Sequence, residues 1–231
     1  MRVLLSLLPL LLLASVSVAH ERDLNSRIRE YILNNPEVII EALEVLAAKE
    51  QKQALRAKLS NHPELFDEPP ILGIGHSDAP IRVIEFFDYK CAPCKAVHPY
   101  LETLVESHPK VRIEMRHLPI LTPGSERAAR FVLAVKTVAG ESVYARVHKE
   151  LWNLRGPLNS ARFASIAKGE ELDFSTVERV MESEEISQRI AYNRDLAIAL
   201  GIAGTPAFVT PNSVTFGTVD IEDLKRIWLS Q

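Results

Sequence analysis

The chain has 231 residues, with 27 Lys and Arg against 30 Asp and Glu, a formal net charge of −3 and 47% hydrophobic residues. This mildly acidic balance offers no electrostatic attraction to phosphate, so nucleic acid is not an expected partner. After removal of a leader, the remaining ~210 residues suit one domain of ordinary size with an appendage.

Residues 1–19 have the pattern of a secretory signal peptide. Arg2 is the positive residue, Val3–Leu13 is a short apolar run, and Ser17-Val18-Ala19 offers small residues for cleavage. The run is short for a membrane span, and an uncleaved anchor is the alternative. We therefore expect export of a soluble mature chain of net charge −4 to the periplasm, a compartment in which disulfides form.

Residues 20–60 are predicted to form a helical oligomerisation segment. Leu24, Ile28 and Tyr31 fall on one face of a short helix, and Pro36 can open a second helix. The apolar residues of this second helix spread around its circumference, which favours burial against a partner chain. Packing back on the chain's own domain is the alternative. Residues 61–79 are rich in Pro and Gly and are predicted to be a linker.

Residues 80–231 alternate between strand and helix patterns and predict an α/β domain. Strands are expected at 82–87, 111–117, 207–210 and 214–216, with helices at 93–107 and 221–229. Between them, residues 124–200 form a block with helical periodicity at 130–138, 143–154, 161–167 and 174–198. The order is therefore βαβ, a helical insertion, then ββα, with a parallel pair in the βαβ unit.

The only two cysteines, Cys91 and Cys94, lie at the junction between the first strand and its helix. A C-x-x-C at such a junction is typical of a redox dithiol. At the helix start, free N–H groups and the helix dipole favour negative charge, so we expect a lowered pKa for Cys91, the nucleophile. Cys94 would resolve the mixed disulfide. Ala92 and Pro93 carry no polar side chain, so the backbone would supply most of the thiolate stabilisation.

Three other uses of the pair are weighed. A structural disulfide between residues three apart closes a tiny loop and gives little stability. Copper(I) binding suits soft thiolates. A holdase or surface antigen with a vestigial dithiol is the third alternative. His98 lies one helical turn beyond Cys94 and is read mainly as an ordinary helix residue, and Lys90 as a solvated charge.

Two further positions are candidates for the site. Glu85 stands in an otherwise apolar strand, where a carboxylate is costly unless it is hydrogen-bonded or takes up a proton. It can accept the proton of Cys94, and a solvent-facing position beside Arg82 is the alternative. Pro206 opens a strand, and a cis Thr205–Pro206 bond would place the exposed backbone of Thr205 beside the dithiol, where it can pair with an extended substrate.

Together these residues resemble the thioredoxin superfamily, and within it the DsbA-like periplasmic oxidoreductases. The similar blocks are Val83–Cys94 and Gly201–Val209, and the likeness runs from about Ile71 to the C-terminus. The resemblance implies a thioredoxin fold, a buried acidic residue at Glu85, a cis-proline at Pro206, and no cofactor beyond the redox-active disulfide.

The segment Ile28–Ile39, with its Asn-Pro-Glu-Val core, is similar to the N-terminal segment of ScsC-type and Com1-like proteins, which include trimeric isomerases and proteins linked to copper tolerance. This implies a homo-oligomer, a trimer among those relatives. We therefore expect a thiol–disulfide oxidoreductase for exported proteins, an isomerase or oxidase, with a membrane or periplasmic redox partner; a copper(I)-binding protein is the alternative. The Ala-Pro loop and Thr205 depart from strong oxidases.

Overall fold

The computed structural model describes residues 23–67, 72–217 and 220–229, and the expected signal peptide at 1–19 lies outside this range. Within it, no helix is both long enough and apolar enough to cross a membrane. The chain divides into two compact units, Met1–Gln53 and Ala54–Gln231.

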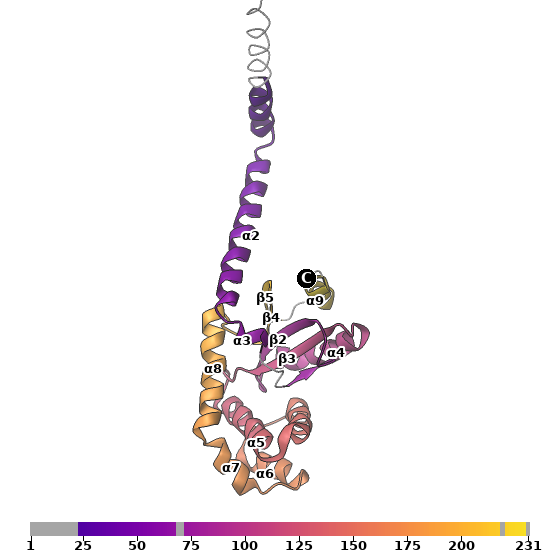
Figure 1. The fold of residues 1–231 in the computed structure, drawn as a ribbon, viewed down its shortest axis with the longest axis vertical. Helices are drawn as coiled ribbons and strands as arrows, with labels where there is room; N and C mark the ends of the chain where they lie inside the picture. The colour runs from indigo at the N-terminus through magenta and orange to yellow at the C-terminus, as the bar shows by residue number, and fades with distance from the viewer. Residues whose placement is uncertain (1–22, 68–71, 218–219, 230–231) are drawn as a thin grey trace, which may run out of the picture. The chain divides into compact units, whose positions relative to one another are not determined.

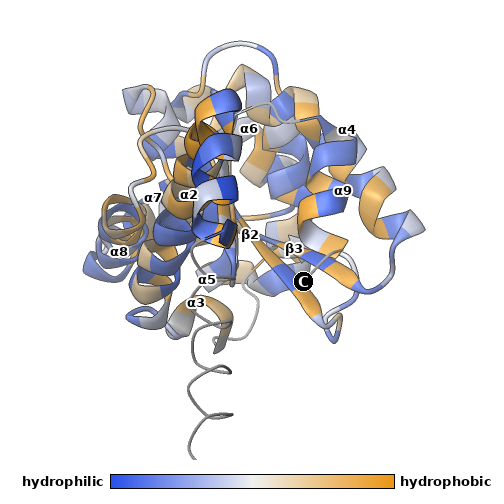
Figure 2. Ribbon diagram, turned by 90° about the horizontal axis from the view of Figure 1, so that it is seen from above, coloured by the Kyte–Doolittle hydropathy of each residue, from blue (hydrophilic) through white to orange (hydrophobic). Residues whose placement is uncertain are grey.

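The described part of the first unit is helical at residues 23–34 and over the start of α2 (Glu37–Ser60). Apolar side chains there are exposed around the helices: Leu24, Ile28, Tyr31, Leu33, Ile39, Ile40, Leu43, Val45 and Leu46. Figure 2 shows hydrophobic and hydrophilic residues interspersed on α2. Within a single chain, residues 23–53 of this unit therefore form no apolar core of their own.

The second unit holds the mixed sheet and its helices (Figure 1). Its strands are β1 (Gly73–Ile74), β2 (Ile81–Phe87), β3 (Val111–His117), β4 (Ala207–Thr210) and β5 (Ser213–Phe216). Its helices after α2 are α3 (Glu64–Asp67), α4 (Ala92–Ser107), α5 (Pro123–Asn153), α6 (Ser160–Gly169), α7 (Phe174–Met181), α8 (Glu184–Leu200) and α9 (Ile221–Leu229).

The strand order is β1-β3-β2-β4-β5. β2 pairs parallel with β3 across the α4 crossover, and β4 and β5 add an antiparallel hairpin beside β2. The expected βαβ and ββα halves are therefore confirmed, and the helical insertion α5–α8 lies between them in the chain.

Alternation along β2 assigns its side chains to two layers. Val83 packs with residues of α4 and α9, and Phe87 packs with the two cysteines. Ile84 and Phe86 point to the other face, where α8 covers them. From Val83 onward β2 is thus buried on both faces, and the dithiol lies on the face toward α4.

The helical insertion agrees with the expected pattern in α5 and departs from it after α6. The expected helices at 130–138 and 143–154 are both present within α5, on either side of a kink at Gly140, whose φ is 81°. The expected single helix at 174–198 is divided into α7 and α8, because Ser183 adopts an extended backbone and its side chain caps Ile186 N. The periodic spacing of apolar residues continues from α7 into α8, so it does not reveal that a second helix begins after Ser183.

The predicted linker at 61–79 is wrong for much of its described part. Leu65 of α3 is fully buried, and β1 pairs antiparallel with β3. Leu59 is buried and Leu55 is partly buried in the same core cluster as Leu65. The second unit thus begins near Ala54 rather than at residue 80, because the last two turns of α2 contribute to its core.

Candidate active site

Cys91 and Cys94 form a disulfide at the N-terminus of α4, with Cα atoms 5.2 Å apart. Cys91 is the N-cap of this helix, and its Sγ accepts a hydrogen bond of 3.1 Å from the backbone N–H of Cys94. Pro93 lies in the first turn, where its missing N–H removes no helical hydrogen bond. A thiolate formed at Cys91 would therefore meet an N–H donor and the positive end of the helix dipole.

Both cysteine residues are buried in the oxidised protein. Cys91 keeps 2% of its surface exposed, whereas Cys94 keeps 0%. Ala92 and Pro93 between them are exposed, and so is Lys90 before them. What little surface the pair exposes in the oxidised protein therefore belongs to Cys91, and the Ala92-Pro93 link between the cysteines faces solvent.

Thr205 and Pro206 lie next to the dithiol although they are more than 110 residues away in sequence. The Thr205 carbonyl oxygen is 3.3 Å from Cys91 Sγ, a separation at which a reduced Cys91 thiol can donate a hydrogen bond. The Thr205–Pro206 bond is cis. The structure thus brings these predicted residues together with Cys91.

Glu85 is fully buried in the middle of β2, opposite Met115 of β3 and Phe208 of β4. Because alternate residues of a strand share a face, Glu85 lies between Val83 and Phe87 on the face covered by α4. Its two carboxylate oxygens have no hydrogen-bond partner among the described residues. Burial raises its pKa from 4.5 to about 8.

The solvent-facing alternative for Glu85 is therefore wrong. Arg82 points to the opposite face of β2, where it forms a bidentate ion pair with Glu114, at 2.6 and 2.7 Å. A pKa near that of a cysteine thiol suits Glu85 for exchanging a proton with one.

Sequence reasoning missed a group of histidine and aromatic side chains that packs against the disulfide. His148 Nδ1 is 2.7 Å from the Tyr89 hydroxyl, and His117 Nε2 is 3.0 Å from the Tyr144 hydroxyl. Burial lowers the pKa of His117 to about 3 and that of His148 well below its usual value. Both imidazoles are therefore neutral near pH 7, and the buried side of the dithiol has no cation among them.

Three members of this group could have been grouped from their spacing in the sequence. Tyr144, His148 and Trp152 are spaced by four residues, which places them on one face of α5. The partners on α4, β2 and β3 could not be assigned from spacing, because their approach depends on how the insertion packs against the sheet.

Asp88 is a second buried group that sequence reasoning missed. Its carboxylate accepts hydrogen bonds from the backbone N–H groups of Lys90, Ile120 and Leu121, at 2.7 to 3.0 Å. Its carbonyl accepts from Cys91 N at 3.0 Å. Asp88 thus fixes the segment before the dithiol to the loop that follows β3.

The remaining candidates lie near the dithiol with other partners. The His98 ring packs on Trp152, with ring centroids 4.5 Å apart, and its Nε2 is 3.6 Å from Glu102. Lys90 is exposed, and its Nζ donates to the Gly156 carbonyl at 3.2 Å. Across the described residues, no three His, Cys, Asp or Glu side chains are placed to hold a metal ion together. Copper(I) binding in that part of the chain would therefore rest on the two cysteines.

Two protein families match this chain, one in each of the two structural units. Residues 82–227 match the family described as DSBA-like thioredoxin domain. Residues 21–53 match the N-terminal domain of the copper resistance protein ScsC. The second match ends at the boundary between the two structural units.

Individual relatives give the same fold in different settings. A thioredoxin-like oxidoreductase from Silicibacter pomeroyi DSS-3 is 33% identical, with a TM-score of 0.64, over 71% of this chain and 94% of its own. ScsC from Proteus mirabilis, in a transitional conformation, is 27% identical with a TM-score of 0.64, over 92% of this chain and 97% of its own.

The Na⁺/H⁺ antiporter NhaA 3 from Salinispora tropica is 27% identical over 68% of this chain. The chain spans only about a quarter of the length of that antiporter and of a second one from Salinispora arenicola.

Proposed function

Because the chain belongs to the DsbA-like family of thiol–disulfide oxidoreductases, we propose that its Cys91–Cys94 pair exchanges disulfide bonds in exported proteins, principally as an isomerase. The observation that carries the proposal is the position of Cys91 as the N-cap of α4, beside the Thr205 carbonyl. A nucleophilic sulfur and a backbone acceptor for an extended substrate thus lie side by side.

The reaction follows from this geometry. The Cys91 thiolate attacks a client disulfide, which forms a mixed disulfide and releases one client thiolate. That thiolate can attack another client disulfide, and a later client thiolate displaces Cys91, so that no net electrons are transferred. If the client stalls, Cys94 attacks the Cys91 sulfur and releases the client reduced. In the fraction of molecules whose Glu85 carboxyl is ionised, this carboxylate accepts the proton that Cys94 loses in this step.

Two features favour isomerisation over strong oxidation. A disulfide is a strong oxidant when its reduced thiolate form is stabilised. The Ala92-Pro93 loop adds no charged or polar side chain that would stabilise this form. The first unit also exposes many apolar residues that an assembly would bury. Several dithiols in one assembly can act on the same misfolded client.

The direct test is the reactivation of scrambled ribonuclease in a thiol buffer. We expect the reduced chain, from residue 23 onward, to accelerate the recovery of ribonuclease activity well above the buffer rate. Reduction of insulin under the same conditions gives a measure of net electron transfer. An unchanged rate of ribonuclease recovery, with insulin reduction intact, would refute isomerisation and leave reduction as the activity.

We also propose that the first unit assembles the chain into a homo-oligomer, with three copies as the sequence resemblance implies. The match of residues 21–53 to the ScsC N-terminal domain supports this. The expected location is the periplasm, in agreement with the leader-like pattern of residues 1–19.

Sedimentation measures the assembly directly. We expect the chain from residue 23 to sediment as a trimer, and a chain from residue 54 to sediment as a monomer. The truncation starts at Ala54 because Leu55 and Leu59 belong to the catalytic core. In the longer chain, Leu43→Glu should weaken assembly, since Leu43 is apolar and 59% exposed, while Glu50→Gln on the same helix should not. A monomeric mass for the longer chain would exclude the assembly.

A further inference from the structure

A cavity of about 370 Å³ lies beside the dithiol, between α4 and the C-terminal end of α5. Lys95, the residue after Cys94, and His98, one turn further, form its wall on α4. Lys149 and Trp152 line it from α5, and Arg155 lines it from the segment that follows. The lining thus begins at the residue that follows Cys94, although neither cysteine is part of it.

The lining of this cavity is cationic although the chain as a whole has a net charge of −3. Lys95, Lys149 and Arg155 face a single carboxylate, Glu102. Lys149 and Arg155 are exposed and Lys95 is half-buried. Burial, and then the charge of Lys90, lowers the pKa of Lys95, so a bound anion would favour its charged form.

The segment that carries Arg155 is held against α4. Lys95 Nζ donates to the Leu154 carbonyl at 2.8 Å, and Lys90 Nζ donates to the Gly156 carbonyl at 3.2 Å. Two lysines that flank the dithiol thus fix the backbone on both sides of Arg155. The cation is therefore part of a built wall and not of a free loop.

Trp152 adds a donor that has no acceptor. The residue is 4% exposed, lines the cavity, and its Nε1 has no hydrogen-bond partner among the described residues. Buried indole N–H groups usually find a partner, and a bound acceptor would supply one. The lining therefore offers three cations and one N–H donor, a set that suits a carboxylate.

We propose that this cavity binds an acidic side chain of the client polypeptide and so favours cysteines that lie near Asp or Glu. This inference rests on the proposed function, and it adds a substrate preference to it. The carboxylate would approach Lys149 and Arg155 from solvent and accept from Trp152 Nε1. Once bound, it would hold the neighbouring client cysteine near Cys91.

The test compares disulfide-bonded peptides that differ only in Glu or Gln at successive positions on either side of the cysteine. The rate constant for exchange with the reduced chain is measured at low salt, without glutathione, whose carboxylates would compete. We expect one or more Glu peptides to react about fivefold faster than their Gln partners, in the range of a few partly exposed ion pairs. Salt should reduce this ratio toward one.

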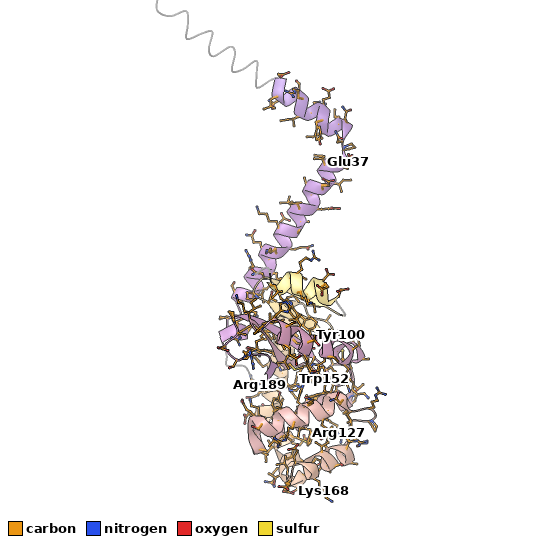
Figure 3. All side chains as sticks on the ribbon, turned by 90° about the vertical axis from the view of Figure 1, so that its right-hand side faces the viewer. Glu37, Tyr100, Arg127, Trp152, Lys168 and Arg189 are labelled. Atoms are coloured by element: carbon orange, nitrogen blue, oxygen red, sulfur yellow. A yellow bond between two sulfur atoms is a disulfide. The ribbon has the colours of Figure 1, made fainter. Side chains whose placement is uncertain are left out.

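Lys149→Gln with Arg155→Gln should bring the Glu-to-Gln ratio near one, and Trp152→Phe should lower it while keeping the ring. The control is Arg162→Gln with Lys168→Gln on α6, which makes the same change in net charge; Figure 3 shows Lys168 at the far end of the insertion from Trp152. An equal ratio for all peptides, or an equal loss in the control, would overturn the proposal.

Binding of a labelled, cysteine-free Glu peptide to the oxidised chain, followed by fluorescence anisotropy, separates the inference from the proposed function. Binding that weakens in the Lys149/Arg155 variant, together with no exchange on any peptide, would retain the anion site and refute the enzyme. Exchange that proceeds at the same rate on Glu and Gln peptides, with no difference in binding, would refute the anion site and retain the enzyme.

Discussion

Replacing Cys91 with serine is expected to reduce thiol–disulfide exchange to the background rate, a loss of at least about 10³-fold. A serine hydroxyl is not ionised near neutral pH and cannot form the mixed disulfide. Cys94 cannot substitute, because it is fully buried in the described structure. Recovery of scrambled ribonuclease activity measures the loss, and thermal unfolding monitors whether the variant is folded.

Cys94→Ser is the matched control, since it also removes the disulfide. This variant keeps the nucleophilic sulfur of Cys91 and lacks the resolving one, so a mixed disulfide with the client should accumulate and be visible on a non-reducing gel. If Cys91→Ser accumulated the adduct instead, the roles assigned to the two cysteines would be reversed.

Glu85→Gln is expected to stabilise the oxidised protein by up to about 3 kcal/mol at pH 7, an unusual sign for a substitution in a core. The native carboxyl, with a pKa of about 8, holds its proton at pH 7, whereas the unfolded one, with a pKa of 4.5, has lost it. Folding must therefore take up a proton, and this opposes folding at neutral pH. Glutamine is neutral in both states and removes the penalty.

The pH dependence of unfolding shows whether the Glu85 carboxyl opposes folding, as expected. Between pH 4.5 and 8 the native state of the original chain binds more protons than the unfolded state, so its stability falls as pH rises. The Gln variant lacks this contribution, and the difference between the two should grow from near zero at pH 4.5 to its maximum near pH 8. His117 and His148 also affect stability, but they are present in both proteins and largely cancel. Urea unfolding at several pH values measures the difference.

Glu114→Gln provides a control of opposite sign. Glu114 is also a buried carboxylate of the sheet, but it accepts two hydrogen bonds from Arg82. Its replacement should destabilise the protein by about 2 kcal/mol, because Arg82 loses its charged partner. The Glu85 variant should also resolve mixed disulfides about tenfold more slowly, since Cys94 loses its proton acceptor. A destabilised Glu85 variant with an unchanged rate would contradict both roles.

The parts of the fold with strong local patterns were predictable. β2 and β3 have apolar residues at regular spacing, and the C-x-x-C places the start of α4, so the βαβ unit follows from the residues alone. The two-residue strand β1 was not predictable, because Gly73 and Ile74 carry no alternation and become a strand only by pairing with β3. The last turns of α2 were assigned to the wrong unit, because the burial of Leu59 depends on tertiary packing.

The residues of the site also divide into those that local sequence predicts and those that depend on tertiary packing. Cys91, Cys94, Glu85 and Pro206 stand out against their local sequence. His117, His148 and Asp88 do not, because histidines and aspartates are common at surfaces and only the packing of the insertion and the loop after β3 encloses them. The cavity beside Trp152 likewise depends on two carbonyl contacts made by Lys90 and Lys95.

A chain with two cysteines has a single possible internal pairing, and here both belong to the reactive pair. Oxidation of the chain therefore involves no choice between alternative disulfide pairings within one molecule, and no further cysteine is present to compete with this pair. The presence of only two cysteines also simplifies labelling. After mild reduction, a thiol-specific maleimide probe can attach only at Cys91 or Cys94. A disulfide cross-link between two copies of the chain must likewise join these cysteines, and it would show that two reactive centres have met.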